Sequence, residues 1–122
     1  MKALTIFSGT QAPGTANSNF DLPDDAKGAI FVLDITAETG TATLDVKIQW
    51  YDEVSGKYID VPGASFAQRS AVGTNALSVY PGLTASANVA VTQCLTKTLR
   101  AVRTEAGGGS DMTYTLTCHP LK

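Results

Sequence analysis

Residues 43–50 alternate strictly between polar and apolar side chains, and this pattern limits the fold more than any other feature of the chain. The apolar members are Leu44, Val46, Ile48 and Trp50. Successive side chains of a β-strand point to opposite faces of a sheet, so a period of two predicts a strand with one face on the core and the other in water. Such a strand needs partner strands and a second apolar layer to cover its buried face.

Other segments carry related strand patterns. In residues 112–118 the apolar members are Met112, Tyr114, Leu116 and Cys118, and polar residues alternate with them. Residues 29–33 are apolar throughout, which predicts a central strand covered on both faces, or covered on one face by a neighbouring subunit. The weaker strand candidates are Ala3–Phe7, Tyr58–Val61, Ser65–Gln68, Ala76–Tyr80 and Leu95–Thr104.

Helix signals are weak along the whole sequence. The best helical candidate, residues 85–93, is rich in Ser, Asn, Val and Thr, and at most a short turn of helix is expected there. Turn signals fall at residues 52–56, 62–63, 81–82 and 107–109. We therefore predict an all-β chain, a single β-sandwich or jelly roll of about eight strands. With 122 residues, 43% of them apolar, residues 1–122 are expected to share one core.

Residues 9–27, GTQAPGTANSNFDLPDDAK, are predicted to form a long N-terminal loop or arm. Phe20 and Leu22 are its only large apolar residues. Two interpretations stay open at this point. The segment is a crossover pinned to the domain by Phe20 and Leu22, or it is an arm that docks on a partner. In the second case Pro13, Phe20 and Leu22 are candidate contact residues.

The overall charge argues against two classes of partner. Nine basic and eleven acidic residues give a formal net charge of -2, so there is no positive field to attract nucleic acid. No segment approaches the ~18 apolar residues of a membrane span, so no membrane partner is expected. The apolar run near the N-terminus is too short for a signal peptide, and synthesis in a cytoplasm is expected.

Catalytic and metal-binding patterns are weak. His119 is the single histidine, and it is expected on the polar face of the last strand, opposite the face that carries Cys118. Asp34 and Asp45 are nominal candidates for a carboxylate pair. The sequence has no CxxC, HExxH or EF-hand spacing. We therefore expect no enzyme activity, no catalytic residue, no metal site and no cofactor.

The two cysteines are expected to remain separate. A hairpin between the last two strands across residues 106–110 would place Leu99 near Leu116 and Ala101 near Tyr114, with Cys94 and Cys118 on opposite faces. A disulfide tolerates a Cα separation of only ~7 Å. Two small buried thiols are therefore predicted.

Aromatic residues beside a turn offer a candidate contact surface. Tyr51 and Tyr58 flank the turn at residues 52–56, and both are candidate contact residues. Sugar-binding sandwiches present such rings to the faces of pyranoses. Trp50 shares the period of the apolar face and is expected to be buried.

Residues 40–68, GTATLDVKIQWYDEVSGKYIDVPGASFAQ, are the most distinctive part of the sequence. They resemble a set of short phage-encoded proteins in which a TLDVKIQ strand precedes a D-x-x-SGKY turn, a D-[IV]-PGA-x-F segment, a later L-x-V-YPG and a TLRAV strand. The matching positions are 43–49, 52, 55–58, 60–64, 66, 77, 79–82 and 98–102. The resemblance covers most of residues 28–117, and residues 113–120 depart from the more apolar, Gly-ending strand of the pattern.

The resemblance implies a structural component of a bacteriophage virion. The expected role is that of a capsid decoration, or cement, protein on the capsid surface that binds the major capsid protein and stabilises the head. A homo-oligomer, and in particular a homotrimer about a local three-fold axis, is expected to meet its neighbours through residues 30–35 or the long N-terminal loop. A tail or neck component and a carbohydrate-binding adhesion module remain alternatives, and a small hydrolase would require paired carboxylates or a nucleophile in a cleft.

Overall fold

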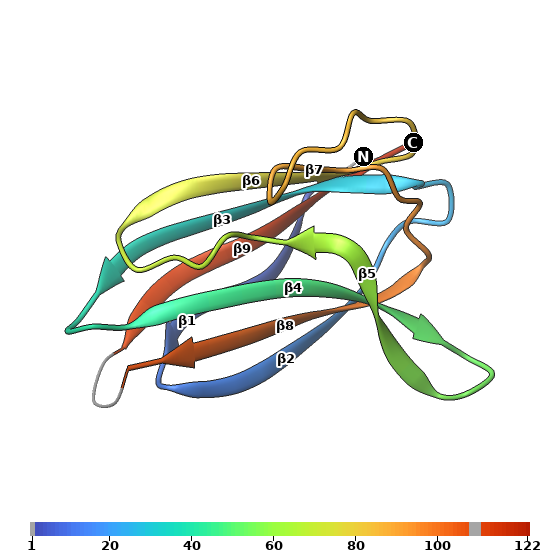
Figure 1. Ribbon diagram of the computed structural model, residues 1–122. Coiled ribbons are helices and arrows are strands. Elements are labelled where there is room, and N and C mark those ends of the chain that lie inside the picture. Colours follow the sequence, from blue (N-terminus) through green and yellow to red (C-terminus); the bar gives the residue numbers. More distant parts are fainter. Residues whose placement is uncertain (1, 108–110) are drawn as a thin grey trace.

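The computed structural model describes residues 2–107 and 111–122, and they contain nine β-strands. The strands are β1 (Leu4–Gln11), β2 (Gly14–Asp21), β3 (Gly28–Glu38), β4 (Thr43–Asp52), β5 (Lys57–Ser65), β6 (Gly73–Val79), β7 (Ala90–Val91), β8 (Thr98–Ala106) and β9 (Met112–Leu121). They form two sheets that pack face to face (Figure 1). One sheet has the order β1-β9-β3-β6-β7, and the other has the order β2-β8-β4-β5.

The strand pairing is that of a jelly roll. β1 pairs with β9, β2 with β8, β3 with β6 and β4 with β5, all antiparallel. The chain therefore runs as one long antiparallel hairpin that is rolled into two layers, and only the two-residue β7 adds a parallel pair, to β6. This topology confirms the predicted all-β sandwich or jelly roll.

The inner faces of the two sheets supply the core. In β4, Leu44, Val46 and Ile48 are fully buried, as their alternation predicts, while Trp50 at the end of the series is only half-buried. All four predicted inner residues of β9 are buried as well. Most residues of the segments Ala3–Phe7, Tyr58–Val61, Ala76–Tyr80 and Leu95–Thr104 lie in strands, whereas residues 66–68 lie outside one.

β3 is a central strand, as its apolar sequence predicts, because it lies between β9 and β6. Its Phe31 and Leu33 are buried against the opposite sheet. Ile30 and Val32 point to the other face and are half-buried, since no further sheet formed by the described residues covers that face. The domain itself therefore covers one face of this strand and leaves the other partly in water.

The predicted long loop at residues 9–27 is wrong. β1 continues to Gln11, and β2 occupies residues 14–21, so the connection between them is Ala12-Pro13. The inward positions of β2 are Ala16, Ser18 and Phe20, of which only Phe20 is large and apolar, and the sequence therefore gives no clear period of two.

The predicted hairpin between the last two strands is also wrong. β8 pairs with β2 and β4, whereas β9 pairs with β1 and β3 in the other sheet. The turn predicted at residues 107–109 falls mostly outside the described residues. Cys118 is buried in β9, where burial raises the pKa of its thiol to about 12. Cys94 is exposed, so only one of the two thiols is buried as predicted.

A group of polar side chains lies between the sheets near the β1 and β2 edges. The Arg103 guanidinium of β8 is 5% exposed and lies 3.8 Å from the centre of the Phe7 ring. It donates hydrogen bonds to Gln11 Oε1 at 2.6 Å, to the Tyr114 hydroxyl at 2.9 Å and to Ser18 Oγ at 3.1 Å. The two terminal nitrogens of this buried cation therefore have neutral acceptors, and an aromatic face lies against it, whereas its Nε has no hydrogen-bond partner among the described residues.

Glu105 is the next inward residue of β8 and is only 2% exposed. Burial raises the pKa of its carboxyl above the ordinary value, and the Asp111 carboxylate adds to the rise, whereas the main-chain N–H of Met112 offsets part of it. The ionised form of Glu105 is therefore disfavoured in the folded domain.

Glu105→Gln is expected to raise the free energy of unfolding at pH 7, because a neutral amide replaces a carboxylate that is costly to keep ionised in the interior. Since the folded-state pKa is raised, the stability of the unsubstituted protein falls as pH rises from the unfolded-state pKa through the folded-state pKa. The advantage of Glu105→Gln should accordingly shrink as pH falls through the folded-state pKa, and it should be lost below about pH 4. Urea unfolding between acid and neutral pH measures this difference.

Glu53→Gln, at an exposed turn position, is the matched control and should change stability little at any pH. If the free energies of unfolding of the Glu105→Gln variant and the unsubstituted protein differed by the same amount across the pH range, the ionised Glu105 carboxylate would not be the cause of the difference.

Candidate partner-binding surface

The β4–β5 hairpin extends beyond the rest of its sheet, at the lower right of Figure 1. Its turn is built on Asp52, whose carboxylate accepts hydrogen bonds from Ser55 Oγ at 2.7 Å and from the Val54 N–H at 3.1 Å. The Ser55 hydrogen bond is the main cause of the lowered pKa of Asp52. Gly56 follows with φ of 70°, a left-handed conformation that glycine adopts without strain. The turn is therefore fixed by local chemistry.

A break in β5 gives the hairpin its direction. Gln49 pairs with Asp60, but Lys47 pairs with Ser65, so the four residues 61–64 leave the ladder. Pro62 has no N–H to donate there, and Gly63 takes φ of 76°. Val61 and Ala64 are buried on either side of this bend. β5 consequently follows β4 from the turn as far as Asp60 and then bends, as Figure 1 shows.

Two tyrosines meet on the outer face of the hairpin. The ring centres of Tyr51 and Tyr58 lie 4.9 Å apart at an interplanar angle of 46°. The Arg100 guanidinium of β8 lies 3.9 Å above the Tyr58 ring. Arg100 also donates two hydrogen bonds to Gln49 Oε1, from Nε at 2.9 Å and from Nη2 at 2.8 Å. The hairpin is thereby tied to the neighbouring central strand.

Asp60 extends this network across to β5. Its Oδ1 accepts a hydrogen bond from Gln49 Nε2 at 2.8 Å and lies 3.1 Å from Lys47 Nζ. The hydrogen bond from Gln49 lowers the pKa of Asp60, and Lys47 lowers it further. Hydrogen bonds therefore link Arg100, Gln49 and Asp60 in a continuous series. The tyrosines are held in one orientation on a stiff support.

The hairpin also carries exposed apolar residues. Val54 at the turn is 97% exposed, and Ile59 on β5 is 51% exposed. At the base, the Trp50 indole N–H donates to the Cys94 carbonyl at 3.2 Å, which fixes the indole against the loop before β8. We refer to Tyr51, Val54, Tyr58, Ile59 and Arg100 as the hairpin surface.

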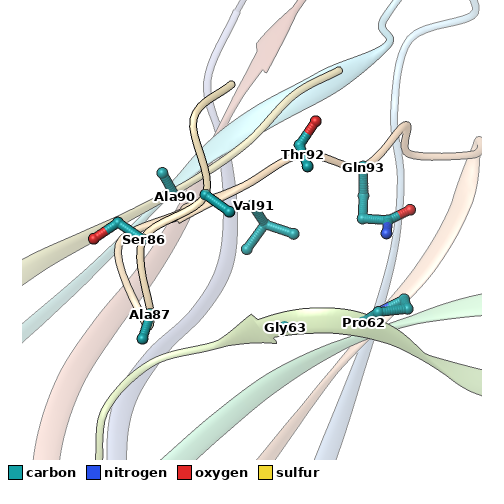
Figure 2. Close-up of a pocket in the computed structure, with 9 residues that line it drawn as sticks. Pro62, Gly63, Ser86, Ala87, Ala90, Val91, Thr92 and Gln93 are labelled. Carbon is teal, nitrogen blue, oxygen red and sulfur yellow. The ribbon is translucent and has the colours of Figure 1, made fainter. Parts of the chain in front are cut away.

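A shallow hollow of about 260 Å³ lies beside the bend of β5. Figure 2 shows Pro62 and Gly63 facing the segment that carries Val91, and the Val91 methyl groups lie 3.9 Å from the position of a Gly63 Cβ. The residues that line the hollow are Pro62, Gly63, Ala85, Ser86, Ala87, Ala90, Val91, Thr92 and Gln93. None of these side chains titrates near neutral pH, so this lining offers contact area and not acid–base chemistry.

The structure separates the contact residues predicted from sequence. Tyr51 and Tyr58 come together, as described. Phe20 packs at 6.0 Å against Phe31, and Leu22 is 2% exposed, so both belong to the core side of the domain and not to a docking arm. Pro13 is exposed, but it does not lie beside the tyrosines. It precedes Gly14, which pairs with Glu105 at the end of β8 opposite to the hairpin.

Sequence reasoning missed Gln49, Asp60 and Arg100. The alternation of β4 places Gln49 on the same outer face as Tyr51, which was a usable signal. The pairing of Gln49 with Arg100 could not be predicted from the sequence, because it requires β8 to lie beside β4, and the two residues are some fifty positions apart in the chain.

The nominal catalytic residues do not converge. Asp34 accepts a hydrogen bond from Thr74 Oγ1 at 2.8 Å on one sheet, and Asp45 accepts one from Gln68 at 2.9 Å on the other. His119 is exposed on β9. Within residues 2–107 and 111–122, no group of three or more His, Cys, Asp or Glu side chains gathers in a way that could hold a metal ion.

Comparisons of the chain with protein-family models, curated proteins and solved structures found no match. No helix in the described part of the chain is long and apolar enough to cross a membrane.

Arg100→Ala is expected to lower the free energy of unfolding by about 1 kcal/mol, because it removes the contact with Tyr58 and two hydrogen bonds to Gln49. Amide hydrogen exchange of residues 49–60 should speed up at the same time. Lys57→Ala, which removes an equal charge from the exposed part of the hairpin, should leave both quantities nearly unchanged. Equal effects of the two substitutions would show that charge, and not the network, is responsible.

Proposed function

We propose that this protein is a structural component of a bacteriophage virion, a capsid decoration protein that binds the major capsid protein and stabilises the head. The observation that carries the proposal is the placement of residues 40–68. The segment that resembles phage-encoded proteins forms β4, the projecting hairpin and the bend of β5. The most distinctive part of the resemblance thus includes the hairpin that projects beyond its sheet.

The hairpin surface has the physical properties of a contact region. It offers two tyrosines, an arginine and the exposed side chains of Val54 and Ile59, and aromatic and arginine residues dominate binding energy at protein interfaces. The hydrogen-bonded support of Gln49 limits the entropy that is lost on binding. The jelly-roll architecture is also one that viral capsid domains use.

The test is binding of the purified protein to empty phage heads. The unsubstituted protein should sediment with heads, and Val54→Asp should weaken binding roughly tenfold, because a charge would have to be desolvated in the contact. Val72→Asp is the matched control, since Val72 is also exposed but lies in the loop before β6, and it should bind normally. Absence of sedimentation with heads under any condition would refute the proposal.

Electron cryomicroscopy of the virion separates decoration from the neighbouring structural alternative. Density for the jelly roll on the outer surface of the head supports the proposal. Density at the neck or tail would instead assign the protein to that part of the virion.

A second candidate function is recognition of a host glycan. The observation that favours it is the combination of Tyr51 and Tyr58 with the polar groups of Arg100, Gln49 and Asp60 on one sheet face. Aromatic rings cover the apolar faces of sugars, and planar polar side chains bond their hydroxyls. Tyr51→Ala would then abolish retention on a glycan array, while Val54→Asp would leave retention intact.

A further inference from the structure

The sheet edges of this domain differ in how they meet solvent. A strand at the end of a sheet exposes unpaired N–H and C=O groups, and proteins commonly block such edges with bulges, prolines, charges or short strands. The four edge strands here are β1, β2, β5 and β7.

Three of these edges are interrupted. β1 has a register shift between Thr5 and Phe7. β5 leaves its ladder over residues 61–64 and contains Pro62. β7 is only two residues long. Each of them offers a short or bent edge to another strand.

β2 has none of these features. It pairs with β8 over all eight residues from Gly14 to Asp21 without a register shift. It contains no proline, lysine or arginine, and its one charged residue, Asp21, is at the end. Its outer side chains Thr15, Asn17 and Asn19 are exposed and neutral. In Figure 1 β2 lies at the lower border, with β8 as its neighbour in the sheet.

We propose that the free edge of β2 pairs with β2 of a second copy of this chain. The two strands run antiparallel about a two-fold axis, and the two four-stranded sheets join into one continuous sheet. In the register centred on Asn17, each Asn17 faces its own copy and each Thr15 faces Asn19. Both copies then use the same surface, as a two-fold axis requires.

The side chains of β2 favour a second copy as the occupant. Main-chain pairing carries little sequence information, so the facing side chains decide which strand fits. In this register Ala16 faces Ser18, and Phe20 faces Gly14, so the largest side chain meets the smallest residue. Asp21 faces Pro13 and not its own copy, so no like charges are opposed. A net charge of -2 adds little long-range repulsion between copies.

The first measurement is the mass of the unsubstituted protein by sedimentation equilibrium. A species of twice the 12.7 kDa chain mass is expected at micromolar concentration. A monomer up to about millimolar concentration would overturn the proposal, because a specific edge pairing should form well below that concentration. A trimer would overturn it as well, since an antiparallel pair of identical strands closes at two copies.

Charge substitutions at Asn17 then test the register. Asn17→Lys and Asn17→Asp should each be monomeric, because like charges face each other across the axis. An equimolar mixture of the two variants should form a mixed dimer, which a folding defect would not allow. Ser8→Lys, which adds the same charge to the exposed face of β1, is the control and should stay dimeric. A dimer that survives Asn17→Lys would place the interface elsewhere.

This inference is independent of the proposed virion role. Loss of head binding with an intact dimer would refute the role alone, and a monomer that binds heads would refute the β2 pairing alone.

Discussion

The apolar layer between the two sheets is the interaction on which the other features of this domain depend. β3 and β9 supply one side of it, and β4 and β8 supply the other. Because side chains alternate between faces, burial of Ile48 and Leu99 requires that their neighbours Gln49 and Arg100 face outward. A slip of one residue in β8 would turn Arg100 into the core and bring Leu99 to the surface. Hydrophobic burial thus fixes which face carries the network under the tyrosines.

The same layer becomes polar toward the β1 and β2 edges. There Arg103 takes an inward position, and Gln11, Ser18 and Tyr114 accept hydrogen bonds from its two terminal nitrogens. This composition explains why β2 carries few apolar residues although it is a full strand. Its inner face packs on a hydrogen-bonded group as well as on hydrocarbon, and small polar side chains suit that surface.

The parts of the fold that could be predicted are those whose signal is local. The strict alternation in β4 and β9 identified both strands and their buried faces, and the turn signal at residues 52–56 located the hairpin beside Tyr51 and Tyr58. β2 was missed because a strand over a polar interior has no hydrophobic period. The hairpin between β8 and β9 was predicted because neighbouring strands usually pair, whereas a jelly roll places them in opposite sheets. Pairings between residues that are far apart in the sequence, including that of Gln49 with Arg100, leave no pattern in the local sequence.

The position of β9 has a consequence for how the molecule is made. Residues 112–121 form a central strand, with β1 on one side and β3 on the other. Until these residues have been synthesised, β1 has no partner in its sheet, and one edge of β3 is unpaired. Elongation therefore precedes assembly of this sheet, and the order of synthesis cannot guide it. During that interval the nascent chain exposes unpaired strand edges, which are open to pairing with other chains.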